Sequence, residues 1–367
     1  MASPLEGIRV VDLSRLLPGA FATLMLAELG AEVIKIEDPR GGDPMRQLPP
    51  LLDGRGLYDL LLNRGKKSVA LDLRLQASAR AFERLVASAD VVVESFRPGT
   101  ARRLGVSAEI LRARHPGLVH CAITGYGQTG PYAERPGHDL NYVSVSGLLA
   151  ADRSPGDLPR MFIADVGGGA MTAVIGILGA LVGRERQGVG ASLDISMHDA
   201  ALYWIMLPAA KELVEGGRAA VGELPTFGRH ASYNVYRTRD NRWMALGALE
   251  EKFWVAFCDA IGRPDLAARH RTDETDQASL IEDMRALFAS RTRDEWVSFL
   301  SGLDVCATPV NDPQEALSDP HAVARGTVQT RNGLRAVRAP FLNDLPVLSP
   351  APALGEHTDT ILAALGN

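Results

Sequence analysis

His138 stands directly beside the carboxylate of Asp139 in the stretch RPGHDLNY, residues 135–142. Histidine titrates near neutral pH and a neighbouring acid can orient its ring, so the pair has the residue types of a proton-transfer site. The longer segment GYGQTGPYAERPGHDLNY contains four glycines and two prolines, a composition that lets a loop approach a ligand closely. A single histidine in a loop is more often a hydrogen-bonded structural group, so both interpretations stay open at this point.

Two other acids stand where an element is expected to begin. Asp165 precedes three glycines and a long apolar segment in IADVGGGAM. An acid at such a junction is typical of a helix N-cap, where the amides of the next turn favour its ionised form, but it can also take part in chemistry. Glu250, in GALEEKFW, has the same two interpretations, because a glutamate there can simply start a helix.

Several well-known kinds of site do not match the sequence. The loop at residues 14–20 lacks the GxGxxG of NAD enzymes, and RGKKS at residues 64–68 fails as a P-loop because Leu60 occupies the position of the first glycine. No GxSxG surrounds Ser144 or Ser146, which disfavours a serine hydrolase. The histidines form no HExxH and no tight cluster, so we expect no metal site.

The composition indicates a soluble globular protein. Of the 367 residues, 46% are hydrophobic and 23% are charged, and the formal net charge of -5 gives no reason to expect a nucleic-acid partner. The apolar stretch 170–182 is too short to span a bilayer and the N-terminal sequence lacks the pattern of a secretory signal, so we expect no membrane association. The cysteines lie far apart without a CxxC, which is typical of a protein of the reducing cytoplasm.

The elements that must position the candidate residues follow from hydrophobic periodicity. In the first third of the chain, short β-branched runs alternate with helical patterns, and this rhythm predicts an α/β fold with a parallel sheet covered by helices. Farther along, strands precede helices, which predicts a smaller α+β domain. We expect strands at 8–13, 31–36, 68–73, 90–94, 118–123, 192–195, 233–236 and 242–246, and helices at 20–29, 77–89, 166–182, 250–261, 280–289 and 294–300.

The predicted domains follow the change in pattern along the chain. A polar segment at 211–228 marks a crossing from one domain to the next. We place the N-terminal part of a large domain at 1–210 and a small α+β domain at 225–320. The remaining residues, 321–367, are rich in proline and are expected to form a strap across a surface rather than a third domain.

Motifs distributed over nearly the whole chain form one recognisable set. They are PLEGIRVVDLSRLLPGAFATLMLAELGAEVIKIEDP, NRGKKSVALDL, DVVVESFRPGTARRLG, TGYGQTGPYAERPGHDLNYVSVSGLL, IADVGGGAMTAVIGILGAL, LDISMHDA, GALEEKFW and PALGEHT. Taken together, these motifs resemble those of family III CoA-transferases (the CaiB/BaiF superfamily), and within them the branch of α-methylacyl-CoA racemases. The resemblance implies a large Rossmann-like domain built from both ends of the chain, with the strap returning to it, a small inserted domain, and a homodimer of interlocked subunits.

The resemblance separates two reactions. In the transferase branch, an aspartate at the position of Asp165 attacks an acyl-CoA, and the position of His138 is usually aromatic. In the racemase branch that position is a histidine, as it is here. The resemblance therefore favours inversion of the α-carbon of 2-methylacyl-CoA thioesters, with CoA transfer as the alternative and a non-catalytic CoA-binding protein as a third interpretation.

For a racemase, the resemblance implies that His138 and Asp165 are the two acid/base groups, acting on opposite faces of the α-carbon through an enolate. Glu250 then supports the imidazole, and the backbone N–H of Asp139, at the start of an expected helix, faces the enolate oxygen. Tyr233 packs near the acyl group. CoA enters as part of the thioester substrate, so no separate cofactor is expected.

The resemblance also implies where CoA is bound. Where related chains often have an arginine after the second strand, this chain has Asp38, and Arg40 is the residue that can replace that contact. The implied CoA- and substrate-binding residues are Arg40, Leu71, Asp72, Leu73, Arg74, Ser95, Phe96, Arg97, Arg103, Gly137, Leu140, Asn141 and Tyr142.

Overall fold

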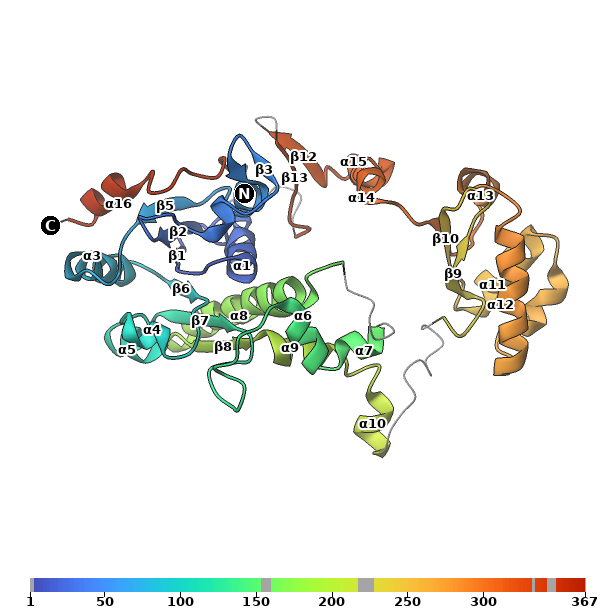
Figure 1. The fold of residues 1–367 in the computed structure, drawn as a ribbon, viewed down its shortest axis with the longest axis horizontal. Helices are drawn as coiled ribbons and strands as arrows, with labels where there is room; N and C mark the ends of the chain where they lie inside the picture. The colour runs from blue at the N-terminus through green and yellow to red at the C-terminus, as the bar shows by residue number, and fades with distance from the viewer. Residues whose placement is uncertain (1–2, 153–159, 217–227, 332–333, 342–347, 367) are drawn as a thin grey trace. The chain divides into compact units, whose positions relative to one another are not determined.

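The computed structural model describes residues 3–152, 160–216, 228–331, 334–341 and 348–366 (Figure 1). The chain divides into two compact units: unit 1 comprises Met1–Ile205 with Thr327–Asn367, and unit 2 comprises Met206–Gly326. The two ends of the chain therefore belong to the same unit. Parts of the predicted crossing segment 211–228, of the predicted small domain at its start, and of the predicted strap lie outside the described residues.

Unit 1 is built on a parallel sheet, which confirms the predicted α/β fold with a parallel sheet. Among the described residues the sheet has six strands in the order β5-β2-β1-β6-β7-β8. The chain runs outward from β1 to β2 and β5 and then crosses back to β6, on the other side of β1, so the strand order reverses between β1 and β6. The strands are β1 (Arg9–Asp12), β2 (Glu32–Glu37), β5 (Lys67–Ala70), β6 (Val91–Glu94), β7 (Val119–Thr124) and β8 (Ser192–Ser196).

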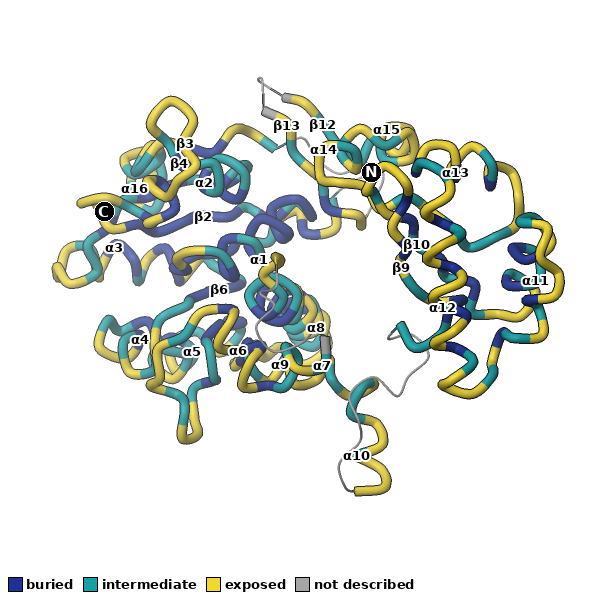
Figure 2. The backbone as a smooth tube through the Cα atoms, turned by 45° about the vertical axis from the view of Figure 1, so that its right-hand side comes forward, coloured by how far each residue is buried: buried dark blue, intermediate teal, exposed yellow. Residues whose placement is uncertain are grey.

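Alternating side chains divide the apolar residues of each strand between two cores. On β1, Val10 packs into a cluster that includes Ala22 of α1 and Ile177 of α8, whereas Val11 packs into a cluster that includes Phe82 of α3. Because helices cover both faces, the strands are buried, as Figure 2 shows for β2 and β6, and their sequences read as nearly continuous apolar runs. The covering helices are α1 (Leu17–Glu28), α3 (Gln76–Ala87), α5 (Ala108–Arg114), α8 (Thr172–Gln187) and α16 (Thr358–Ala364).

The shorter elements of unit 1 lie mainly in the connections between strands and helices. The predicted helix 166–182 consists of two elements, the π-helical segment η2 (Ile163–Met171) and α8 after it. The other elements are η1 (Pro44–Arg46), β3 (Leu51–Leu52), β4 (Arg55–Gly56), α2 (Leu57–Leu62), α4 (Thr100–Arg103), α6 (Asp139–Val145), α7 (Leu148–Asp152), α9 (Met197–Trp204) and a hairpin of β12 (Val328–Arg331) and β13 (Leu334–Val337).

The C-terminal segment runs along the edge strand β5. The amide of His357 donates to the carbonyl oxygen of Ser68 at 2.9 Å, the amide of Ala70 donates to Oγ1 of Thr358 at 3.0 Å, and the amide of Gly355 donates to Oγ of Ser68 at 2.9 Å. These bonds occupy backbone groups that an exposed edge would offer to another chain. Figure 1 shows α16, in red, beside β5 and α3.

Unit 2 has a three-stranded antiparallel sheet in the order β11-β10-β9, with helices packed against it. Its core is aromatic, and the rings of Tyr236 and Phe288 stack at a centroid distance of 4.8 Å. The strand β11 was not predicted, because three residues are too few for a period of two to be recognised. The elements are α10 (Ala210–Glu215), β9 (Tyr233–Arg237), β10 (Trp243–Gly247), α11 (Glu251–Ala260), η4 (Pro264–Arg269), α12 (Glu274–Phe288), α13 (Arg293–Leu300), β11 (Ala307–Pro309), α14 (Pro313–Ala316) and α15 (Pro320–Ala324).

One helical stretch among the described residues, Ile163–Gln187, is long and apolar enough to cross a membrane by length and composition alone. It comprises η2 and α8, and 39% of its most apolar window is buried inside the structure. A core helix of a globular protein satisfies the same criterion, so length and composition do not by themselves indicate a membrane span.

A buried charge cluster joins β1, α1, β2 and the segment before β5. Asp12, at the end of β1, accepts hydrogen bonds from Oγ1 of Thr23 at 2.6 Å and from Nζ of Lys66 at 3.3 Å. Nζ of Lys35 lies 3.9 Å from Asp12 and 3.0 Å from Asp43. Burial alone would raise the pKa of Asp12, but the two ammonium groups bring it below its usual value. For Lys66, burial outweighs the attraction of Asp12, so the pKa of the Lys66 ammonium group falls to about 8.

We expect Lys66→Met to lower the free energy of unfolding by about 3–5 kcal/mol, because the substitution removes one partner of a buried ion pair and leaves Asp12 with less compensation. Urea unfolding followed by circular dichroism measures the change. Glu109→Gln is the control, since it removes half of the exposed Arg102–Glu109 pair and should cost less than about 1 kcal/mol. Equal losses in the two variants would contradict a special role of the buried cluster.

Candidate functional site

His138 is the exposed residue at which helix α6 begins. Its backbone N–H donates to Oδ1 of Asn141 at 3.0 Å. The hydroxyl of Tyr142 donates to the carbonyl oxygen of Gly137 at 2.6 Å. Both bonds connect the first turns of the helix with the residues before it, so they fix the backbone conformation around His138.

The ring of Tyr142 packs against both ends of the glycine-rich loop that precedes α6. A Cβ atom at Gly125 would lie 2.5 Å from Cε1 of Tyr142, and a Cβ atom at Gly137 would lie 2.7 Å from the same atom. Glycine is therefore needed at both positions for the ring to sit there. The ring of Tyr126 adds an edge-to-face contact at a centroid distance of 5.2 Å. The two glycines thus allow the aromatic rings to pack closely against the loop that precedes His138.

Asp165 lies inside η2, a π-helical segment of the kind often found at functional sites. The glycine run that follows it allows a close approach of α9, because a Cβ atom at Gly167 would lie 2.3 Å from Cη2 of Trp204. The residue at the N-cap of η2 is Phe162, and Asp165 is the third residue of the segment. Of the two interpretations of Asp165, the structure therefore contradicts the helix N-cap.

The carboxylate of Asp139 connects α6 with η2. Its Oδ1 accepts a hydrogen bond from the backbone N–H of Asp165 at 2.8 Å, and Asp139 itself is buried. Burial, and after it the charge of Asp139, raise the pKa of Asp165 to about 7. The site therefore does not favour the ionised form that an N-cap would favour. A carboxyl group with this pKa can both take and give a proton near neutral pH.

The phenol of Tyr142 lies within electrostatic reach of the same group of residues. Burial raises its pKa to about 12, the charges of Asp165 and Asp139 act in the same direction, and Arg97 acts against them. Arg97 follows β6, so it brings a cation from another strand end toward α6.

The backbone N–H of Asp139 is a free donor at the start of α6. In the described part of the chain it has no hydrogen-bond acceptor, as is usual for the first amides of a helix. The donor belongs to the residue directly after His138 and to the same residue whose carboxylate holds Asp165.

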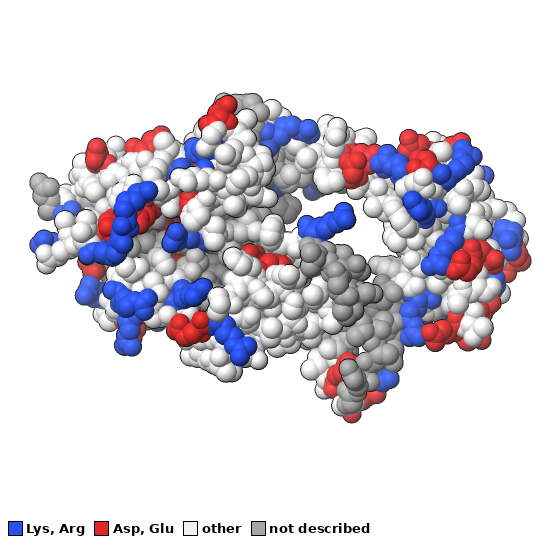
Figure 3. Space-filling view, in the orientation of Figure 1, with Lys and Arg blue, Asp and Glu red and all other residues white. Residues whose placement is uncertain are grey.

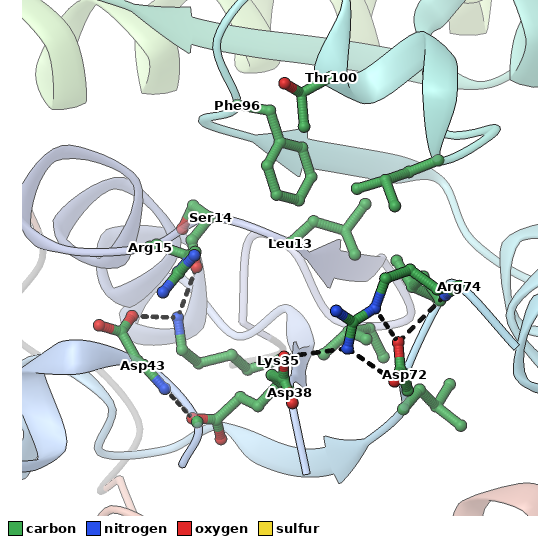
Figure 4. A pocket seen from close by; sticks show the side chains of 16 residues that line it. Leu13, Ser14, Arg15, Lys35, Asp38, Asp43, Asp72, Arg74, Phe96 and Thr100 are labelled. Atoms are coloured by element: carbon green, nitrogen blue, oxygen red, sulfur yellow. Dashed lines mark hydrogen bonds and ion pairs between the residues drawn. The ribbon is translucent and has the colours of Figure 1, made fainter. Parts of the chain in front are cut away.

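A cavity of about 260 Å³ lies at the carboxyl ends of β1, β2, β5 and β6 (Figure 4). The strand order reverses between β1 and β6, and α/β sheets bind ligands outside the strand ends at such a reversal. The cavity is lined by residues 13–15 after β1, residues 35–38 at the end of β2, residues 71–74 after β5, Phe96 after β6, and residues 42, 43, 100 and 104.

The lining combines ion pairs with an apolar surface. Nζ of Lys35 lies 3.0 Å from Oδ2 of Asp43, and Nε of Arg74 lies 2.7 Å from Oδ1 of Asp72. Figure 4 shows these two pairs on opposite sides, with the side chain of Phe96 above them. Such a lining suits a ligand that has both a planar apolar part and polar groups.

The cavity gathers part of the predicted CoA-binding set. Leu71, Asp72, Leu73, Arg74 and Phe96 line it.

Ser95 and Arg103 do not line the cavity but contact residues that do. Oγ of Ser95 accepts from the amide of Arg15 at 2.9 Å, and Nη2 of Arg103 donates to Oγ1 of Thr100 at 2.8 Å. The remaining predicted members lie elsewhere in unit 1: Arg40 is exposed and bound to Asp38, Arg97 is near Tyr142, and Gly137, Leu140, Asn141 and Tyr142 belong to the loop and helix around His138.

Four charged residues of the cavity, Arg15, Lys35, Glu37 and Asp43, were not predicted as site residues from the sequence. A signal for Lys35 exists in the sequence, since it interrupts the apolar strand EVIKIE, and a buried lysine is rare unless it is paired. Arg15 and Asp43 stand in loops, where the sequence does not distinguish them from solvated residues.

In unit 2, Tyr233 and Glu250 lie at the same end of the three-stranded sheet. Tyr233 is paired with Gly247, the last residue of β10, and Glu250 is the exposed N-cap of α11. The amide of Gly247 donates to the carbonyl oxygen of Cys306 at 2.7 Å. Burial, and after it the charge of Glu250, raise the pKa of the Cys306 thiol, so Glu250 is near this cysteine. Support of His138 by Glu250 would join residues of different units and stays a prediction.

Charges of both signs are mixed on the surface of unit 1. Figure 3 shows Lys and Arg side chains interspersed with Asp and Glu over the part that carries α3, α4 and α5. Within the described residues, no group of three or more His, Cys, Asp or Glu side chains could hold a metal ion.

Comparison with known proteins gives one family and two named reactions. The sequence pattern of CoA-transferase family III matches residues 5–358. The chain is 31% identical over 371 residues to the alpha-methylacyl-CoA racemase of Homo sapiens, covering 99% of this chain and 93% of that protein. It is 34% identical over 382 residues to the succinyl-CoA–D-citramalate CoA-transferase of Chloroflexus aurantiacus, covering 99% and 94%. A solved CAIB/BAIF family protein from Brucella suis has a TM-score of 0.87 at 31% identity, covering 100% of both chains.

We expect Asp165→Asn to become more stable than the wild type as the pH rises. The pKa of Asp165 is about 7 in the folded protein against an ordinary 3.8, so folding retains a proton that the unfolded chain releases above about pH 4. The contribution of this group is complete below that pH and is lost as the pH rises toward 7 and beyond. Asparagine does not titrate, so the advantage should grow to about 1–3 kcal/mol by pH 8.

Urea midpoints of both proteins at pH 5, 6, 7 and 8 measure the difference. Glu134→Gln is the control, because Glu134 is exposed in the same loop as His138 and should give a difference that does not change with pH. A constant offset for Asp165→Asn would contradict the raised pKa.

Proposed function

Because this chain belongs to CoA-transferase family III, we propose that it binds acyl-CoA thioesters and inverts the α-carbon of 2-methylacyl-CoA by proton transfer. One observation carries the proposal: the residue that follows His138 is hydrogen-bonded to Asp165, a partly buried acid whose pKa is about 7. CoA transfer requires only the acid, whereas inversion of a carbon requires two proton carriers. A histidine next in sequence to the residue that binds the acid therefore favours inversion.

The two proton carriers act on opposite faces of the substrate. Neutral His138 takes the α-proton of one enantiomer, and protonated Asp165 gives a proton to the other face of the resulting enolate. In the opposite direction ionised Asp165 takes the proton and protonated His138 returns one. A pKa near 7 supports both roles of Asp165, since each protonation state is well populated at neutral pH.

The enolate oxygen carries negative charge and needs a fixed donor. The free N–H of Asp139 at the start of α6 is that donor in our proposal. The side chain of Asp139 is a positioning group instead, because its carboxylate is already engaged with the amide of Asp165. One residue thus contributes a backbone donor to the substrate and a side-chain acceptor to the catalytic acid.

Unit 2 contributes the remaining predicted groups. Glu250, exposed at the start of α11, orients the imidazole of His138 and stabilises its cationic form, and Tyr233 packs near the acyl group. Their common location at one end of the three-stranded sheet supports a joint role.

The nucleotide end of CoA enters the cavity at the ends of β1, β2, β5 and β6. Phe96 offers a ring surface for the adenine, and Arg15 together with Arg97 and Arg103 offers cations for the phosphates. Arg97 lies near Tyr142, which supports a path for the pantetheine arm from the cavity toward His138. CoA is part of the substrate in this proposal, and the reaction uses no separate cofactor.

We propose that the protein is a homodimer with interlocked subunits. Large apolar side chains are exposed along η2, α8 and α9, an arrangement typical of a protein–protein interface. Ile175 of α8 and Tyr203 of α9 are each 71% exposed, and Met161, which precedes η2, is 75% exposed. The cysteines of the described chain are free, which suits the reducing cytoplasm in which we place the protein.

The alternative function is CoA transfer with Asp165 as the nucleophile, and the identity to a named CoA-transferase favours it as the second candidate. The ionised carboxylate would attack the thioester carbonyl, form a mixed anhydride and release CoA as a thiolate. The CoA thiolate would then attack the Asp165 acyl carbon of the anhydride and release the donor carboxylate, which leaves an enzyme thioester. The acceptor carboxylate would attack this thioester to give a second anhydride and free CoA thiolate. The thiolate would attack the acceptor acyl group to form the new thioester and release the Asp165 carboxylate.

Incubation with (R)-2-methylacyl-CoA in deuterated water distinguishes these functions. We expect deuterium at the α-carbon and formation of the S epimer, measured by mass spectrometry and chiral chromatography. Transfer of CoA to an added carboxylate without α-exchange would contradict the proposal and support the alternative. Binding of CoA with neither reaction would leave the protein as a non-catalytic CoA-binding protein.

We expect His138→Ala to reduce α-deuterium exchange by about 10²–10⁴-fold, the usual loss when a positioned proton carrier is removed. A transferase that depends on Asp165 would keep most of its activity in this variant. His321→Ala is the matched control, because His321 is exposed in α15 of unit 2 and only its backbone makes a hydrogen bond. Unchanged exchange in His138→Ala would remove His138 from the mechanism.

A further inference from the structure

Asp38 lines the nucleotide cavity and follows directly after the last residue of β2. In dinucleotide-binding sheets an acid near the start of the nucleotide site accepts hydrogen bonds from ribose hydroxyls, whereas an arginine there accommodates a ribose phosphate. The charge at this strand end therefore distinguishes a ribose with free hydroxyls from a ribose that carries a phosphate.

The arginines around Asp38 are already paired. Nε and Nη2 of Arg40 lie 2.9 and 2.6 Å from the two carboxylate oxygens of Asp38. Nε and Nη2 of Arg74 lie 2.7 and 2.7 Å from those of Asp72, and Nη2 of Arg74 is also 3.7 Å from Asp38. In both arginines, the Nε–Nη2 edge, one of the two edges that can hold two phosphate oxygens side by side, is occupied by a carboxylate.

Asp38 is an ionised acceptor at the surface of the cavity. Hydrogen bonds from the side chain of Arg40 lower its pKa, so the carboxylate is charged at neutral pH. Its side chain is 44% exposed, and Figure 4 shows it between Lys35 and Arg74. A carboxylate with bound arginine still has lone pairs for the hydroxyls of a sugar.

The other cations of the lining leave little for an additional phosphate. Lys35 is buried and bound to Asp43 and to the carbonyl oxygen of Ser14. Among the described lining residues, Arg15 is the cation whose guanidinium makes no hydrogen bond or ion pair. Together with Arg97 and Arg103, which lie outside the lining and which we assign to the phosphates, this guanidinium suits the pyrophosphate that every form of the nucleotide carries.

We propose that Asp38 makes this cavity selective for a ribose with free hydroxyls, so that thioesters of dephospho-CoA are used at least as well as thioesters of CoA. The inference rests on the proposed function, since it assumes that the nucleotide end of an acyl-CoA enters this cavity. CoA carries a phosphate on the 3′-oxygen of its ribose, whereas dephospho-CoA has a hydroxyl there. Asp38 accepts the hydroxyl and repels the phosphate.

The test compares CoA and dephospho-CoA on the full-length protein. Calorimetry gives the dissociation constant of each nucleotide, and α-deuterium exchange gives kcat/KM for the same 2-methylacyl group on each carrier. In the wild type we expect CoA to bind no more tightly than dephospho-CoA. In Asp38→Asn we expect the preference to move toward CoA by about tenfold, the size expected when one like charge near a phosphate is removed in a solvent-exposed site.

Two further variants serve as controls. Asp38→Glu keeps the charge and should keep the wild-type preference, and Glu109→Gln removes a charge from an exposed pair that lies outside the cavity lining and should also keep it.

The outcomes separate this inference from the proposed function. Wild-type protein that exchanges the α-proton but binds CoA several-fold more tightly than dephospho-CoA, with no change in Asp38→Asn, would overturn the role of Asp38 and leave the proposed function intact. Protein that binds neither nucleotide would overturn both. Protein that binds both but does not exchange would overturn only the racemase, because the dissociation constants still measure the preference.

Discussion

The pairing of the buried Asp12 carboxylate with its partners is the interaction on which the arrangement of unit 1 most depends. An ion without water around it is stable only if other groups replace the water. Its partners come from separate segments: Thr23 from α1, Lys35 from β2 and Lys66 from the turn before β5. The charge of one side chain therefore holds β1, its neighbouring strand and the first covering helix in a single arrangement. Through Lys35 the same cluster extends to Asp43 and forms one wall of the cavity at the strand ends.

A second carboxylate, Asp139, has the opposite effect on its neighbour. Asp12 is stabilised as an ion by cations, whereas Asp139 lies beside another acid and helps to keep Asp165 partly protonated. A buried acid with a raised pKa costs stability near neutral pH, and such costs are typical of groups that exchange protons with a substrate. The hydrogen bond from the Asp165 amide to Asp139 holds the two acids together despite their repulsion, so the same contact positions Asp165 and adds to the effect of burial on its pKa.

The cavity and the His138 region are built on the same sheet but differ in what the fold contributes. The reversal of strand order determines where the cavity lies. The pairing of Arg40 and Arg74 with acids determines the charge around it. Around His138, the backbone conformation is fixed by the packing of the Tyr142 ring against a loop that requires glycine at two positions. The fold is shared by proteins named for two reactions, so the chemistry depends on these local side chains rather than on the sheet.

The sequence by itself determined the parallel sheet, because buried strands read as apolar runs that periodicity detects, and its motifs indicated the family and the residues His138 and Asp165. Five of the predicted CoA contacts line one cavity. Tertiary structure decided the rest. It placed Asp165 inside a π-helical segment instead of at a cap, made Asp139 its hydrogen-bond partner, and paired Arg40 with Asp38. The burial of a side chain and the charges around it depend on segments that are distant in the sequence. Local sequence patterns do not specify which of these segments come into contact, so they could not predict these features.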